Sequence, residues 1–175
     1  MSKDEHVFKI EQSLAIQSVT IKALVDDDCA SSVIPLANVD AKNLTLVIEF
    51  LKKQTLFTAA KDAYTQLENK EESTKNAEKK RAKEEEKKKL DLLENDVKSV
   101  YKDLENDALI EVIMVANYLD IQALMDATCQ QMADNIKHKT PEEVQKIFNI
   151  PNDYKPEEEA ARKEDAWEFE NIDQD

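Results

Sequence analysis

Residues 109–150 decide how this chain folds. They read LIEVIMVANYLDIQALMDATCQQMADNIKHKTPEEVQKIFNI. Between Leu109 and Leu119 only Glu111 and Asn117 are strongly polar, so this segment is predicted to be a helix buried nearly all round. Asp120 interrupts the apolar run and is expected to cap a second helix. The stretch therefore predicts a scaffold of successive helices.

The second helix carries one apolar stripe at helical spacing, made of Ile121, Leu124, Met125, Thr128, Cys129, Met132 and Ile136. Such a stripe either packs on the chain's own core or waits for a partner. The helices after Asp120 each have one apolar face and form a thin layer with little of their own to bury. From the residues alone, both readings stay open.

A third helix is predicted to start at residues 140–143, Thr-Pro-Glu-Glu. Threonine at the cap, proline at the first position and glutamate at the third satisfy the free N–H groups together. This helix carries Val144 and Phe148 and is expected to stop before Pro151. A last helix is expected from about residue 156 to 169.

The N-terminal part mixes short extended segments with helices. Residues 6–10 alternate weakly and predict a short strand. Residues 13–25 have helical periodicity, with Ser13 as the expected cap. Residues 33–36 form a short extended segment, because Pro35 biases its predecessor toward extended geometry. A further helix is expected to begin at Asn38 or Asp40.

A highly charged segment interrupts this pattern at about residues 61–89. Between residues 68 and 89 the only apolar side chains are Ala77 and Ala82, so the segment cannot bury a core. Its Glu, Lys, Arg and Ala content still favours a solvated helix. The basic patch at 79–83 could be a nuclear-import signal, but its acidic neighbours favour a solvated face.

Composition excludes several classes of function. A chain of 175 residues suits one domain, or one domain with an appended module, and its net charge of −14 disfavours nucleic acid and anionic membranes as partners. The absence of glycine argues against phosphate-cradling loops, and Cys29 and Cys129 lack partners at metal-ligand spacing. With no signal peptide or membrane span expected, we expect a cytoplasmic and nuclear protein.

No catalytic constellation is found in the sequence. Cys129 and His138 are nine positions apart, which places them on opposite faces of a helix. The acidic clusters lie in charge-rich, solvated contexts, where general acid work is not expected. We therefore predict no enzyme, no cofactor and no metal site.

A set of short motifs occurs in order along the chain: residues 17–22 (QSVTIK), 34–36 (IPL), 38–39 (NV), 116–121 (ANYLDI), 128–129 (TC), 139–143 (KTPEE), 148–150 (FNI) and Trp167. Together these motifs resemble the Skp-type adaptor subunit of SCF (Skp, cullin, F-box) ubiquitin ligases. The resemblance covers about two thirds of the chain.

The resemblance implies a BTB/POZ-type fold of the α+β class, mostly helical, with a small sheet. Residues 1–119 would form the BTB/POZ-like domain, interrupted by the charged insert at 61–89. Residues 120–175 would form a C-terminal helical F-box-binding module. The implied function is that of a non-catalytic adaptor that bridges a cullin to F-box substrate receptors in ubiquitin-dependent protein degradation.

The same resemblance implies two sets of contact residues. Asn117 and Tyr118 would face the cullin. The F-box surface would comprise Ile121, Leu124, Met125, Thr128, Cys129, Met132, Ile136, Val144, Phe148, Ile150 and Trp167.

The sequence also departs from the family pattern. A first strand with its glycine turn, usual before residues 6–10, is absent, and the family's acidic loop is replaced by the charged insert. A tryptophan usual before the Leu109 helix is missing, with Val97 near its place. The alternative function is therefore an F-box-binding scaffold or decoy that no longer engages a cullin.

Overall fold

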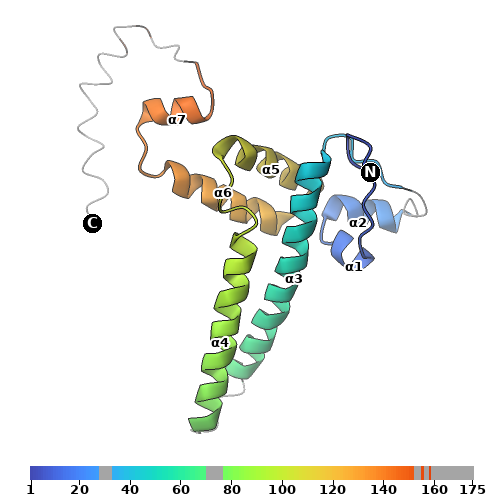
Figure 1. Cartoon of the computed structure of the whole chain (residues 1–175), viewed down its shortest axis with the longest axis vertical. Coiled ribbons are helices and arrows are strands. Elements are labelled where there is room, and N and C mark those ends of the chain that lie inside the picture. The colour runs from blue at the N-terminus through green and yellow to red at the C-terminus, as the bar shows by residue number, and fades with distance from the viewer. Residues whose placement is uncertain (28–32, 70–76, 152–154, 156–157, 159–175) are drawn as a thin grey trace. The chain divides into compact units, whose positions relative to one another are not determined.

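The structure, a computed structural model, describes residues 1–27, 33–69, 77–151, 155 and 158. It contains two compact units, Met1–Lys137 and His138–Asp175, and each is described by itself. The helices of the described part are α1 (Gln12–Ala15), α2 (Val19–Asp26), α3 (Ala41–Asn69), α4 (Ala77–Lys98), α5 (Asn106–Leu119), α6 (Gln122–Ile136) and α7 (Pro141–Ile147), labelled in Figure 1.

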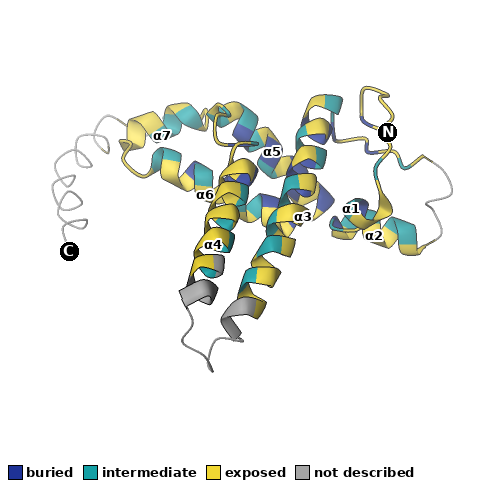
Figure 2. Cartoon of the chain, turned by 60° about the horizontal axis from the view of Figure 1, so that its bottom comes forward, coloured by how far each residue is buried: buried dark blue, intermediate teal, exposed yellow. Residues whose placement is uncertain are grey.

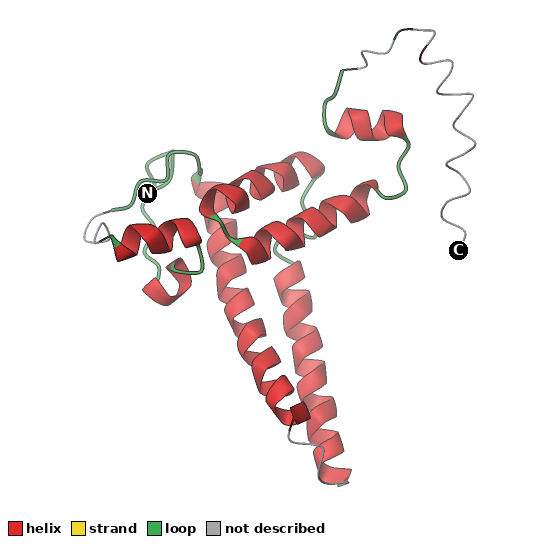
Figure 3. Ribbon diagram, turned by 180° about the vertical axis from the view of Figure 1, so that it is seen from behind, coloured by secondary structure: helices red, strands yellow, loops and turns green. Residues whose placement is uncertain are grey.

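The expected small sheet is absent from the described residues, so the α+β prediction is wrong and the fold is helical (Figure 3). Residues 6–10 are not a strand, because a strand needs a partner with a row of hydrogen-bonding groups. The other segment expected to be extended, residues 33–36, is short and contains Pro35, which has no N–H to donate. Met1 alone bridges to this segment, since its nitrogen donates to the Ile34 carbonyl at 2.6 Å and its carbonyl accepts from Leu36 at 2.7 Å.

Helix α5 is the centre of the core in the first unit (Figure 2). Its buried side chains belong to one cluster with Val47 and Phe50 of α3 and with Leu124 of α6. They are Leu109, Val112, Val115, Ala116 and Leu119. The expectation that this helix is buried nearly all round is nevertheless wrong, because Met114 is 67% exposed and Tyr118 is 36% exposed.

The start of α2 meets the end of α5. The buried Ser18 hydroxyl donates to the Leu119 carbonyl, and its oxygen accepts from the Ile21 N–H at 3.1 Å. Ser18 is therefore the N-cap of α2, so the single helix expected from Ser13 is in fact two helices. The same side chain therefore caps α2 and fixes the start of α2 to the end of α5.

Asp120 ends α5 instead of capping α6, contrary to expectation. Its φ of 49° is left-handed, and its neighbour Ile121 donates to the Ala116 carbonyl at 2.9 Å, as in a helix C-cap. The N-cap of α6 is Ile121, which makes no side-chain cap. Asparagine and aspartate tolerate this backbone region better than other non-glycine residues.

Helices α3 and α4 lie side by side as an antiparallel pair (Figures 1 and 2). The ring centroids of Phe50 and Tyr101 are 6.4 Å apart near the end of α4. The Lys53 amine of α3 lies 3.0 Å from the Glu49 carboxylate and 3.1 Å from the Asp96 carboxylate. The Lys53 ammonium donates hydrogen bonds to both carboxylates, which stabilise its charged form and raise the pKa of Lys53. The pair includes much of the charged segment, whose prediction as helix is confirmed for residues 61–69 and 77–89. None of the described helices is long and apolar enough to cross a membrane.

We expect Ser18→Ala to lower the free energy of unfolding by about 2–3 kcal/mol, because it removes a helix cap and leaves a buried carbonyl without its donor. Urea denaturation followed by circular dichroism measures this change. The matched control is Ser13→Ala, since Ser13 is exposed and caps no helix. Equal midpoints for the two variants would show that the α2–α5 junction contributes little.

Candidate protein-binding surfaces

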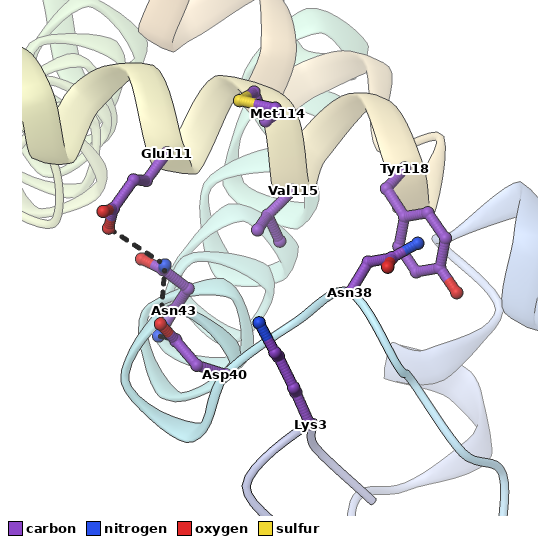
Figure 4. Close-up of a pocket in the computed structure, with 8 residues that line it drawn as sticks. All are labelled: Lys3, Asn38, Asp40, Asn43, Glu111, Met114, Val115 and Tyr118. Carbon is purple, nitrogen blue, oxygen red and sulfur yellow. Dashed lines mark hydrogen bonds between the residues drawn. The ribbon is translucent and has the colours of Figure 1, made fainter.

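One face of α5 borders a cavity of about 500 Å³ in the first unit (Figure 4). Glu111, Met114, Val115 and Tyr118 line it from α5, at positions that recur on one side of a helix. Lys3, Asn38, Asp40 and Asn43 line it from the N-terminal segment and the start of α3. Its lining mixes polar and apolar side chains, of which Asn43 and Val115 are buried and Met114 and Tyr118 are exposed. Such a mixture is typical of protein contacts.

Hydrogen bonds at the N-cap of α3 order the polar side chains Asp40 and Asn43 that line this cavity. Asp40 accepts from the Asn43 N–H at 2.7 Å, which confirms Asp40 as one of the two expected helix starts. The Asn43 amide donates to Asp40 and to Glu111, each at 3.4 Å (Figure 4). The beginning of α3 is therefore tied to the middle of α5 beneath the exposed side chains.

Asn117 and Tyr118, the predicted cullin contacts, lie at the C-terminal end of α5, and both are exposed. The Thr20 hydroxyl donates to the Tyr118 carbonyl at 3.1 Å, so α2 fixes the backbone at this point. Met114, one turn before Tyr118, is also exposed, and the sequence did not predict this because an apolar residue in an apolar run has the chemistry of a core residue. Its signal was the spacing of Glu111, Met114 and Tyr118, which marks one helix face.

The predicted F-box stripe on α6 divides between core and surface. Four of its seven members are buried in the first unit: Ile121, Leu124, Thr128 and Met132. Met125 and Ile136 are half-buried against the core, and Cys129 is an exposed free thiol. The stripe therefore packs mainly on the chain's own core, and its outer edge is open to a partner.

In the second unit, α7 has the expected capping box. The Thr140 hydroxyl accepts from the Glu143 N–H at 3.3 Å, and the Glu143 carboxylate accepts from the Thr140 N–H at 2.9 Å. After α7, Asn149 has a left-handed φ of 50°, and the Ile150 N–H donates to the Gln145 carbonyl at 2.8 Å. This turn leaves Phe148 38% exposed and Ile150 53% exposed.

The remaining predicted F-box residues are Val144 and Trp167. Val144 is half-buried in α7. Trp167 and the helix expected at 156–169 lie outside the described residues, apart from Glu158. Within the described part, no cluster of His, Cys, Asp and Glu side chains could hold a metal ion. The exposed groups on α5, α6 and α7 are suited to binding proteins.

Two family models match the chain. The dimerisation domain of the Skp1 family matches residues 122–168, and the tetramerisation domain of the same family matches residues 1–56. SKP1-like proteins 11 and 12 of Arabidopsis thaliana are 42% and 43% identical to the chain, over 97% of it and 95% of each relative. SKP1-like protein 20 of Oryza sativa subsp. japonica is 39% identical over 97% of the chain and 92% of the relative.

The chain belongs to the Skp1 family. The resemblance inferred from the ANYLDI, TC and KTPEE motifs is thereby confirmed, and with it the role of an adaptor of SCF-type ubiquitin ligases. The family match that begins at residue 122 lies close to the predicted domain boundary at 120. By spatial compactness, however, α6 belongs with the first unit, which ends at Lys137.

We expect Thr140→Ala to loosen α7 in the full chain, because it removes the hydroxyl half of the capping box at a cost of about 1 kcal/mol. Amide hydrogen exchange at residues 143–148 should become roughly fivefold faster. The matched control is Lys139→Ala, which changes the adjacent exposed residue and leaves the box intact. Equal exchange in the two variants would contradict a stabilising role of the cap.

Proposed function

We propose that this adaptor bridges a cullin to F-box substrate receptors through two separate surfaces. The observation that carries the proposal is the split character of α5, which buries five side chains in the core and exposes Met114 and Tyr118 on its other face. A helix anchored on one side and apolar on the other presents a rigid docking surface.

The cullin-facing surface comprises Met114, Asn117 and Tyr118. Tyrosine contributes strongly to protein interfaces because its ring buries much apolar area while its hydroxyl keeps a hydrogen bond. The hydrogen bond from Thr20 of α2 already fixes the backbone of Tyr118. Binding a partner therefore costs little conformational entropy at this residue. A partner with apolar side chains next to polar groups complements the cavity beside these residues.

Two F-box contacts are proposed, one in each unit: the open edge of α6 and the end of α7. Cys129, Met125 and Ile136 supply the contact on α6, and Phe148 and Ile150 supply the contact after α7. The buried members of the α6 stripe support the first contact by fixing that helix on the core. Trp167 is assigned to F-box binding through the family resemblance.

The adaptor's work is positional, and we propose that it catalyses no reaction itself. It binds a receptor and a scaffold at the same time, so that a bound substrate reaches the transfer machinery at high effective concentration. Neither proposed surface contains a nucleophile hydrogen-bonded to a base in the described residues.

We expect Asn117→Ala together with Tyr118→Ala to weaken cullin binding by about tenfold or more, because interface tyrosines are frequent hot spots. F-box binding by the same variant should be unchanged. Co-precipitation with purified partners, followed by titration calorimetry, measures both. Leu92→Ala is the control, since Leu92 is 70% exposed on α4 and lies in neither surface. If the unaltered chain binds F-box proteins but no cullin, the decoy function holds instead.

We expect Phe148→Ala together with Trp167→Ala to weaken F-box binding by about tenfold or more and to leave cullin binding intact. A second readout uses a chain with Cys29→Ser, in which only Cys129 can react with a maleimide. A bound F-box protein should slow this labelling. Unchanged pull-down by the double variant would contradict the α7 part of the surface, and unchanged labelling would contradict the α6 part.

A further inference from the structure

Residues 7–10 form neither a helix nor a turn, and their backbone has no hydrogen-bonding partner among the described residues. Phe8 and Ile10 are half-buried, Lys9 is exposed and Val7 is 58% exposed. A row of free N–H and C=O groups is a template for pairing with another strand.

An apolar groove of about 640 Å³ lies beside this segment in the first unit. All four residues of the segment line it, together with side chains from residues 33–36, α1, α2 and α3. A free backbone next to an apolar groove is the arrangement that accepts an added strand, in which main-chain hydrogen bonds supply affinity and the groove supplies specificity.

The charge at this groove is positive. Lys9 and Gln12 are the only polar side chains among the described residues that line it, and Lys9 is the only charged one. Glu5 and Glu11 are near in sequence, but neither lines the groove. Lys9 makes no ion pair within the described part of the chain. In a chain with a net charge of −14, a cation left without a carboxylate beside an apolar groove is complementary to an acidic ligand.

We propose that this groove binds an extended segment of another protein in which aliphatic side chains flank one glutamate or aspartate. The backbone of that segment pairs with residues 7–10, its aliphatic side chains enter the groove, and its carboxylate lies against the Lys9 ammonium. This contact is separate from the F-box and cullin contacts proposed above and does not rest on them.

Two observations favour such a segment over other occupants. The free N–H and C=O groups of residues 7–10 need partners that the aliphatic chain of a small apolar molecule cannot supply. A second copy of this chain paired through residues 7–10 would bring no carboxylate from that segment, so Lys9 would stay without an opposite charge.

The probe for the charge is the end-blocked peptide Thr-Val-Glu-Val-Thr, and Thr-Val-Lys-Val-Thr is its matched control. Titration into the isotope-labelled full chain, followed by nuclear magnetic resonance, should shift the amide signals of residues 7–10. The lysine peptide should bind about threefold more weakly. Lys9→Glu should reverse this preference. Lys22→Glu, the same charge change at an exposed position outside the groove, should leave it unchanged.

The probe for backbone pairing is the acidic peptide in two forms, each methylated on a different alternate set of amide nitrogens. Only one edge of a strand faces its partner, so one form should lose binding and the other should keep it. Dodecanoate, which has a carboxylate and an apolar chain but no peptide backbone, tests a small-molecule occupant. Dilution of the chain without peptide tests a second copy.

The proposal is overturned if the two methylated forms bind equally, if the glutamate and lysine peptides bind equally, or if neither peptide shifts amides 7–10 at its solubility limit. It is also overturned if dodecanoate shifts these amides as the acidic peptide does, or if they shift on dilution of the chain alone. F-box binding by Lys9→Glu should equal that of the unaltered chain, which separates failure of this proposal from failure of the adaptor function.

Discussion

The hydrogen bonds between the start of α2 and the end of α5 are the constraint on which the first unit depends. Ser18 and Thr20 donate their hydroxyls to the carbonyls of Leu119 and Tyr118, and the Val19 N–H donates to the Asp120 carbonyl at 3.2 Å. Free carbonyls at one helix end are thereby satisfied by donors at another helix start, where the helix dipoles also attract. The end of α5 is fixed as a result, and the exposed Tyr118 is fixed with it.

Much of the helical part of the fold could be predicted from local sequence, because its signals are local. The Thr140 capping box and the Asp40 helix start each need only a few neighbouring residues, and both are confirmed. The sheet could not be settled in this way, since residues 6–10 have the alternation of a strand and lack its partner. Asp120 misled for a related reason: aspartate suits both the start of a helix and a left-handed end, and only the chain's path decides between them.

Which side chains of the candidate surfaces are exposed could be predicted from the sequence only in part. The family motif marked Asn117 and Tyr118, whereas Met114 has the same chemistry as the core residues around it and differs only in the face it occupies. Periodicity likewise placed Leu124 and Cys129 in one stripe, although the first is fully buried and the second is exposed. Periodicity in the sequence shows which side of a helix is apolar. How many of those side chains stay exposed to solvent depends on how neighbouring helices pack against that side.

The proposed contacts at Tyr118, Phe148 and Ile150 lie near left-handed residues that are not glycine. Asp120 is two residues after Tyr118, and Asn149 lies between Phe148 and Ile150, with φ values of 49° and 50°. Such conformations cost about 1 kcal/mol or more at each position. Glycine would remove that cost, but it would also give the backbone more conformational freedom. In a chain without glycine, these turns are held instead by hydrogen bonds on either side, such as those from Ile121 to Ala116 and from Ile150 to Gln145. The strain therefore lies where the direction of a binding side chain has to be fixed.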